Sequence, residues 1–347
     1  MYYVGVDLHK ESSWFYVMDE SGKRVMSENV SNSPDVLNEF FQRISSPFYL
    51  AVEATYNWYF FVDIAEKYAD EVYLANSYEL KAFAKRHKKT DKIDAHLIAD
   101  VLRKGYLPTV TIPGKHIRSI KEYLHYRMNL VSDRSRYISR LKSVLDKLGL
   151  PSSGDFTTYK RLNLISVEGL SEYYQKVICG YIENIRYLNR QIYQTEKMLE
   201  KIGEFDPDIR NLKTIPGIGD FSGALIKSEI IDINRFRSFN RLCAYAGLAP
   251  RVSKSSHKIF RGPLNKNRRK ALQWILIEVA HHYIKGLSEK KKKYERIAKR
   301  KSRNTAKVCL ARDLLKIVYH VLKEKRPFYL HKEEQIRSVA ASALCGV

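Results

Sequence analysis

The first hundred residues constrain the fold most strongly, because three β-forming stretches follow one another before any helical pattern begins. Short turns separate these stretches, as expected of strands joined by hairpins. Helical and strand patterns then alternate, in the order βββαβαβα. Antiparallel hairpins followed by crossover connections predict a mixed sheet with helices packed on it. The predicted strands are 2–8, 14–20, 24–30, 47–55 and 71–76, and the predicted helices are 33–44, 57–69, 77–89 and 91–105.

The pattern changes between about residues 117 and 202, where two apolar stripes recur at a spacing of three to four residues. The stretch PSSGDF separates them. This arrangement predicts two long helices that form an antiparallel pair or a coiled coil, which would serve as a spacer or a dimerisation arm. Two core helices of a larger domain fit the same pattern equally well.

A third, mostly helical region begins near residue 212 and contains a PGIG turn, a basic serine-rich loop and further amphipathic helices. The chain is therefore predicted to combine an α/β part with an all-α part. The predicted divisions are an α/β domain at 1–112, a helical spacer at 113–205, a mostly helical domain at 206–330 and a poorly ordered tail at 331–347.

The charge of the chain indicates its partners. There are 61 Lys and Arg residues against 38 Asp and Glu residues, a formal net charge of +23. Such a field attracts polyanions, so nucleic acid is the first candidate partner and an anionic membrane surface the second. The sequence shows neither a signal peptide nor an apolar run of about 18 residues, so insertion into a membrane is not expected. The four cysteines form no CxxC pair, which predicts a reducing cytoplasm rather than disulfides or a zinc site.

Four carboxylates occupy positions that favour a metal site. Asp7 lies in the first predicted strand, Glu53 ends the fourth, and Asp91 and Asp94 share one face at the start of a helix. Two sheet acids and two helix acids converging on hard divalent cations are typical of phosphoryl transfer and of an RNase H-like fold. Each acid also has an ordinary explanation: Asp91 as a helix N-cap, Asp94 in the helix dipole, and Asp7 in a salt bridge.

Two basic or glycine-rich segments of the third region could bind phosphate. In TIPGIG, Gly217 and Gly219 permit a tight turn ahead of a helix N-terminus, as in a helix-hairpin-helix motif. A purely structural turn is the alternative. The loop RVSKSSHKIFRG has no acidic residue and several serines, so it is suited either to hold a phosphate backbone or to attack a phosphate.

Five motifs in a fixed order carry a resemblance that covers nearly the whole chain. They are VGVDLHK, AVEAT, KTDKIDAHLIADVLRKG, TIPGIG and RLCAYAGLAPRVSKSSHKIFRG. In this order they resemble insertion-sequence transposases that combine an N-terminal RuvC-like DEDD domain with a C-terminal serine transposase domain. Members of that family act as recombinases guided by a bridge RNA. Site-specific DNA invertases of the same architecture form a related group.

The resemblance implies roles for individual residues. Asp7, Glu53, Asp91 and Asp94 match the catalytic and metal-binding acids, with Mg²⁺ or Mn²⁺ as the cofactor. Ser255 matches the nucleophile that forms a covalent phosphoserine link, and Ser256 is the alternative because the family's glycine pair after the serine is missing here. The residues expected to bind nucleic acid are Arg251, Lys254, Lys258, Arg261, Lys266, Arg268, Arg269, Lys270, Gly217 and Gly219.

These observations predict a DNA transposase or recombinase that acts on donor and target DNA with a structured guide RNA. The resemblance favours a composite site between subunits, in a homodimer or homotetramer. A bacterial or archaeal, cytoplasmic and nucleoid-associated protein is expected. The alternatives are a RuvC-like junction nuclease in which water attacks, a site-specific invertase, and a non-catalytic nucleic-acid-binding protein.

Overall fold

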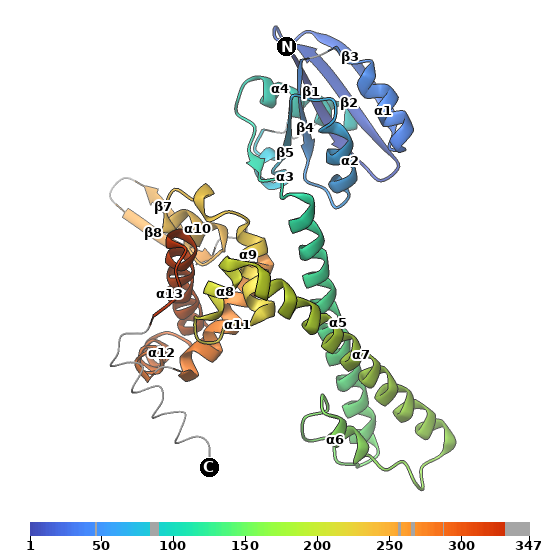
Figure 1. Ribbon diagram of the computed structural model, residues 1–347, viewed down its shortest axis with the longest axis vertical. Coiled ribbons are helices and arrows are strands. Elements are labelled where there is room, and N and C mark those ends of the chain that lie inside the picture. The colour runs from blue at the N-terminus through green and yellow to red at the C-terminus, as the bar shows by residue number, and fades with distance from the viewer. Residues whose placement is uncertain (46, 84–89, 256–257, 265–267, 287, 330–347) are drawn as a thin grey trace. The chain divides into compact units, whose positions relative to one another are not determined.

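A computed structural model describes the chain except for residues 46, 84–89, 256–257, 265–267, 287 and 330–347 (Figure 1). The chain divides into two compact units, Met1–Pro113 and Gly114–Val347. Each unit has its own hydrophobic core. The tail predicted at 331–347 lies outside the described residues.

A six-stranded mixed sheet forms the centre of the first unit. The mixed sheet confirms the prediction, which had five of the six strands. The strand order is β3-β2-β1-β4-β5-β6. The pairs β1–β2 and β2–β3 are antiparallel, whereas β1–β4 and β4–β5 are parallel. The elements are β1 (Tyr2–Leu8), β2 (Ser12–Asp19), β3 (Arg24–Ser31), α1 (Pro34–Gln42), β4 (Phe48–Glu53), α2 (Trp58–Ala65), β5 (Glu71–Ala75), α3 (Ser77–Leu80), α4 (Asp91–Arg103) and β6 (Thr109–Val110).

The two faces of strand β1 are covered by different helices. Val4, Val6 and Leu8 are buried in a cluster that also contains apolar residues of α1 and α2. Because successive side chains of a strand point to opposite faces, Gly5 and Asp7 face the other layer, which is formed by α4. Figure 1 shows α4 on one side of the sheet and α1 and α2 on the other.

Gly5 allows α4 to lie directly on β1. A Cβ atom at this position would lie 2.2 Å from the carbonyl oxygen of Ala95 and 2.4 Å from the backbone nitrogen of Ala99. Only glycine permits backbones to approach so closely. Asp7 follows Gly5 by two residues and Asp91 precedes Ala95 by one helical turn, so this contact brings the two acids to the same end of the unit.

The prediction of a helix over 77–89 is wrong at its centre. Helix α3 ends at Leu80, and the next three residues form turns, whereas 84–89 lie outside the described residues. Leu80 is the one buried residue of α3, and Tyr78 is 55% exposed. A single buried side chain cannot stabilise a long helix that has a strongly basic end. The short strand β6 was not predicted.

Two long helices open the second unit, and they pack against each other in antiparallel directions. Arg127 donates to Glu196 at 2.6 Å, and Arg134 donates to Asn189 at 2.9 Å. Residue numbers rise along the first helix while those of their partners fall along the second, so the two helices form the predicted antiparallel pair. The elements are α5 (Lys115–Lys147), α6 (Tyr159–Asn163) and α7 (Glu172–Phe205).

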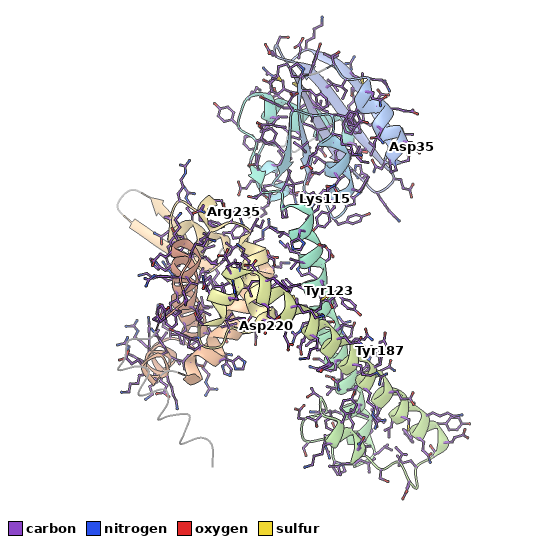
Figure 2. The ribbon with its side chains drawn as sticks, in the orientation of Figure 1. Asp35, Lys115, Tyr123, Tyr187, Asp220 and Arg235 are labelled. Atoms are coloured by element: carbon purple, nitrogen blue, oxygen red, sulfur yellow. The ribbon has the colours of Figure 1, made fainter. Side chains whose placement is uncertain are left out.

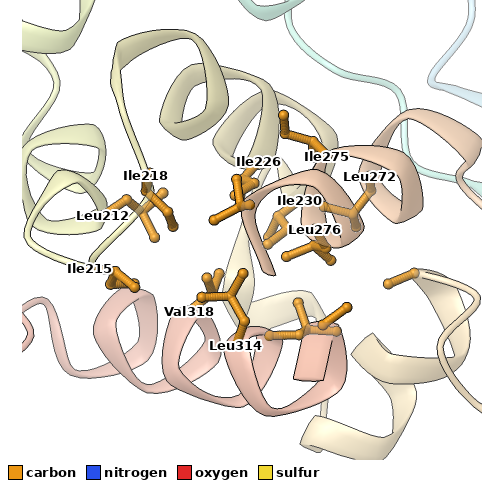
Figure 3. Close-up of a cluster of buried hydrophobic side chains, with 14 of the residues drawn as sticks. Leu212, Ile215, Ile218, Ile226, Ile230, Leu272, Ile275, Leu276, Leu314 and Val318 are labelled. Carbon is orange, nitrogen blue, oxygen red and sulfur yellow. The ribbon is translucent and has the colours of Figure 1, made fainter. Parts of the chain in front are cut away.

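The largest hydrophobic core of the described chain lies in the second unit (Figure 3). It begins with Leu124 on α5 and ends with Leu322 on the last helix. Figure 3 shows Ile226, Leu276 and Leu314 from three different helices meeting in it. The elements are α8 (Pro207–Lys213), α9 (Asp220–Ile230), η1 (Ile233–Arg235), α10 (Phe239–Tyr245), β7 (Pro250–Ser255), β8 (Lys258–Leu264), α11 (Lys270–Gly286), α12 (Ser288–Arg300) and α13 (Arg303–Glu324).

Asp208 ties the end of α13 to α8. The residue is 7% exposed, and its carboxylate accepts from Lys227 and from Lys325, the latter at 2.7 and 2.8 Å. Three residues further on, the backbone N–H of Phe328 donates to Thr214 Oγ1 at 2.7 Å. A buried carboxylate flanked by two ammonium groups holds together segments more than a hundred residues apart.

The serine-rich segment is a β-hairpin rather than a loop. Strands β7 and β8 pair in antiparallel register, and Ser255 is opposite Lys258. This differs from the prediction, because the many charged and hydroxyl residues obscure the β-forming Val252, Ile259 and Phe260. Among the described helices, none combines the length and the apolar composition needed to cross a bilayer.

Candidate active site

Asp7 is the buried centre of the acidic site. Asp7 is 6% exposed and lies near the end of β1. Burial raises the pKa of Asp7 to about 6; His9 opposes this shift, and the charges of Asp94, Asp91 and Glu53 add to it. The other three predicted acids therefore all act electrostatically on Asp7, as expected of a clustered carboxylate site.

His9 is a member of this site that the sequence analysis missed. Its Nε2 atom lies 3.2 Å from Asp7 Oδ2 and 3.4 Å from Asp91 Oδ2, so the imidazole bridges the sheet acid and the helix acid. The carbonyl oxygen of His9 accepts from Asn32 at 2.9 Å and from Asn57 at 2.7 Å, which holds the backbone in place. Its position two residues after Asp7, on the same side of an extended chain, was the available signal.

The start of α4 presents Asp91 without using it as a cap. Thr90 is the N-cap, and its Oγ1 accepts from the N–H of Ile93 at 3.3 Å. The explanation of Asp91 as an N-cap is therefore wrong. Asp91 is the first helical residue and Asp94 is three residues further on, so both acids are within the first turn. Acidic side chains are favoured there by the helix dipole.

Glu53 is placed by the sheet. It is the last residue of β4, the strand parallel to β1, and it pairs with Ala75 of β5. Adjacent parallel strands therefore deliver Asp7 and Glu53 to the same edge. Glu53 and Asp94 lie outside the tightest group, in which ligand atoms of Asp7, His9 and Asp91 lie within 4.8 Å of one another.

The donor set suits a hard divalent cation. Carboxylate oxygens are the preferred ligands of Mg²⁺ and Mn²⁺, and Mn²⁺ also accepts an imidazole nitrogen. Burial, and after it the acidic neighbours, raises the pKa of the Asp7 carboxylate, so its negative charge is disfavoured in the metal-free protein. A bound cation would compensate that charge, so Asp7, Asp91, Asp94 and Glu53 fit a metal-binding role.

The predicted nucleophile region lies in the second unit. Ser255 ends β7 next to the two-residue connection, whereas Ser256 lies outside the described residues. Of the predicted nucleic-acid-binding residues, Arg251 and Lys254 belong to β7, and Lys258 and Arg261 to β8. Both strands therefore contribute cations to the hairpin. Lys266 lies outside the described residues.

The basic residues that follow the hairpin differ in what they contact. The side chain of Arg269 donates to the Tyr245 hydroxyl at 2.9 Å, so it joins α10 to α11. Arg268 packs against Gly247, whose φ of +69° also favours glycine. Lys270 is exposed at the start of α11. Arg269 thus has a structural contact, and Lys270 is open to a ligand.

The PGIG turn is held mainly by contacts within the protein. Gly217 has a φ of +89°, and a Cβ atom there would lie 3.2 Å from His282 Cβ. The N–H of Gly219 donates to Ser222 Oγ at 2.9 Å. Asp220, which Figure 2 labels, is the first residue of α9 and forms an ion pair with Lys213. These contacts give the turn a structural role, and phosphate binding by Gly217 and Gly219 stays a prediction.

Two regions of the chain match known protein families. Residues 4–149 match a family model described as "Transposase", of the DEDD type found in IS110 elements, and residues 209–296 match "Transposase IS116/IS110/IS902 family". The first match contains all four predicted acids, and the second contains the serine hairpin.

Several curated proteins are similar along most of their length. The transposase for insertion sequence element IS1111A of Coxiella burnetii is 24% identical over 94% of this chain and 90% of its own. The transposase for IS1328 of Yersinia enterocolitica is 24% identical over 82% of this chain and 84% of its own. The pilin gene-inverting protein of Moraxella bovis is 26% identical over 82% of this chain and 83% of its own. The chain therefore carries the two transposase domains of the IS110/IS116 family and is an enzyme that cleaves and rejoins DNA.

Proposed function

We propose that this transposase cuts DNA at a divalent-metal site built on Asp7, Glu53, Asp91 and Asp94, with Mg²⁺ or Mn²⁺ as the cofactor. The observation that carries the proposal is the buried carboxylate of Asp7, whose pKa is raised by burial and by its three acidic neighbours. When bound, the cation supplies positive charge that stabilises the negative charge developing on the scissile phosphate.

The residues of the first unit hold that site in place. Gly5 fixes the distance between β1 and α4, and Thr90 fixes the start of the helix that carries two of the acids. His9 lies between Asp7 and Asp91, where it orients both carboxylates in the metal-free protein. The site is therefore preorganised by rigid elements rather than by loops.

The proposed nucleophile is Ser255, with Ser256 as the alternative. In the proposed step, the serine oxygen bonds to the scissile phosphorus while the bond from phosphorus to the 3′ oxygen breaks. The serine proton leaves to solvent, and the departing oxygen takes up a proton to become a 3′-hydroxyl. The resulting phosphoserine link retains the bond energy, so rejoining needs no nucleotide cofactor. The place of Ser255 at the end of a strand lined with basic residues supports this role.

A structured guide RNA and an oligomer complete the proposal. The net charge of +23 supports binding to more than one nucleic acid. The resemblance of the five motifs to serine transposases supports a site completed in a homodimer or homotetramer. The donor and target DNA would then be chosen by base pairing with the RNA.

The experiment compares Ser255→Ala, Ser256→Ala and Asp7→Ala on nicked donor DNA with Mg²⁺, target DNA and RNA transcribed from the element's flanks. Ser253→Ala is the matched control, because Ser253 lies in the same strand. We expect wild type and the control to form a covalent protein–DNA adduct, and Ser255→Ala and Asp7→Ala to lose it. An adduct that survives in Ser255→Ala but not in Ser256→Ala would move the nucleophile to Ser256. Full cleavage without either serine would contradict the phosphoserine route, and full cleavage by Asp7→Ala would contradict the metal site.

A further inference from the structure

A groove on the second unit is lined by residues of α12, of α13 and of the segment that follows α13. We name it the α12–α13 groove. Its volume is about 460 Å³, which is within the range of pockets that bind a small ligand. Its lining residues are Lys290, Lys293, Asp313, Lys316, Ile317, His320, Val321, Glu324, Arg326, Pro327, Phe328 and Tyr329.

The charges in the groove leave two lysines for an anion. Lys293 is paired with Asp313, and Arg326 is paired with Glu324. With these two pairs set aside, Lys290 and Lys316 remain, and no ion pair joins either of them to an acid among the described residues. The groove therefore carries a net charge of +2 with its histidine neutral, and it attracts phosphate groups.

Aromatic and aliphatic groups lie beside those lysines. Tyr329 is 70% exposed although its large ring would gain from burial, and Phe328 lines the groove next to it. The N–H of Phe328 is bound to Thr214 Oγ1 at 2.7 Å, which fixes the backbone immediately before Tyr329. Ile317 and Val321 supply an apolar floor. An exposed ring on an anchored backbone is suited to stack on a planar ligand at low entropic cost.

We propose that the α12–α13 groove binds an unpaired strand of DNA, with one base stacked on Tyr329 and the flanking phosphates at Lys290 and Lys316. Cations that follow a backbone, together with rings that stack on bases, are the combination that recognises single-stranded nucleic acid. A duplex hides the faces of its bases, so it cannot use the ring. DNA is the expected strand because the enzyme cleaves and rejoins DNA, which exposes unpaired ends.

The inference rests on the fact that the enzyme acts on DNA, and it is independent of the proposed metal and serine chemistry. The test therefore measures binding without catalysis. Full-length protein is titrated, without divalent metal, against fluorescein-labelled dT12, and fluorescence anisotropy gives Kd over a range of salt concentrations. The same protein is titrated against an abasic 12-mer, a 12-base-pair duplex and U12 RNA. The variants are Tyr329→Ala and Lys290→Ala/Lys316→Ala.

Control substitutions remove an exposed tyrosine and an exposed lysine from α7. Tyr173 is 81% exposed, and the side chain of Lys176 is 74% exposed. Tyr173→Ala and Lys176→Ala should bind dT12 as wild type does. Tyr329→Ala should weaken dT12 binding ~10-fold and leave binding of the abasic strand unchanged, because stacking on a base is what it removes. The double lysine variant should lower the salt dependence of log K by about 1.4, about 0.7 for each lost phosphate contact.

Several outcomes would overturn the inference. The first is wild-type affinity for dT12 in both groove variants. The second is a loss of affinity that is equally large in the control variants or on the abasic strand. The third is tighter binding of U12 than of dT12, which would assign the groove to RNA. A groove variant that binds normally while Asp7→Ala abolishes cleavage would end this inference and leave the proposed function intact.

Discussion

Replacing Gly5 with alanine tests whether the contact between β1 and α4 builds the acidic site. The new Cβ atom would lie 2.2 Å from the carbonyl oxygen of Ala95, whereas real Cβ atoms keep at least 3.0 Å from such neighbours. The helix must therefore move by at least 0.8 Å, the difference between these distances. Overpacking of this kind costs about 1–3 kcal/mol. A displacement of about 1 Å at a catalytic site costs about 100-fold in rate.

The assay measures three properties of Gly5→Ala: thermal unfolding, Mg²⁺ affinity by calorimetry, and DNA cleavage. We expect a lower Tm, Mg²⁺ binding weakened by about tenfold or more, since ligand positions must hold to about 0.2 Å, and a large loss of cleavage. The matched control is Gly180→Ala, where an added Cβ atom meets nothing within 4 Å. That variant should keep its metal affinity and activity and gain slightly in helix stability.

A second substitution separates backbone from side-chain crowding. The two nearest atoms to the new Cβ belong to the backbone, so removing the Ala99 side chain in Gly5→Ala/Ala99→Gly should not restore metal binding. Restoration by Ala99→Gly would refute the backbone argument. Wild-type Tm, metal affinity and cleavage in Gly5→Ala itself would refute the role of this contact altogether.

Three further predictions concern single side chains. Because folding raises the pKa of Asp7 from 3.8 to about 6, the stability it contributes is present below pH 4 and is lost as pH rises through 6. Metal-free Asp7→Asn should therefore be more stable than wild type at pH 8 by about 1–2 kcal/mol in urea unfolding, should lose this gain at pH 4, and should not respond to Mg²⁺. Lys121→Met leaves the buried Glu229 carboxylate unpaired and should cost about 3–5 kcal/mol in the same measurement, most of which Lys121→Met/Glu229→Leu should recover. Thr90→Ala should cost about 1 kcal/mol through the lost cap, with Thr90→Ser close to wild type; equal stability of Thr90→Ala and wild type would contradict the cap.

The sheet of the first unit could be predicted because its signals are local. Alternation in β1, β2 and β3 and the short turns between them define hairpins, and the structure confirms their order and pairing. The acids at the end of β4 and the start of α4 were visible for the same reason. The tight approach at Gly5 was not, since it depends on which helix crosses which strand.

The features that sequence patterns missed depend on contacts between distant residues. His9 looks like an ordinary polar residue after a strand until α4 brings Asp91 within 3.4 Å of it. The sequence predicts a loop where β7 and β8 form a hairpin, because charged and hydroxyl residues outnumber the β-forming ones. Asp91 was a plausible cap by residue type, yet the neighbouring Thr90 occupies that position.

The span of the second core has a consequence for how the protein is made. Asp208 is tied to Lys325, and the same core runs from Leu124 to Leu322. A ribosome releases these segments in order, so this core lacks its last helix until Glu324 has been synthesised. The first unit closes much earlier, within Met1–Pro113, and can fold during synthesis. A message truncated before α13 would therefore yield a folded first unit attached to a second unit without its complete core. Chaperones and proteases would act on that product, which would not be a working transposase.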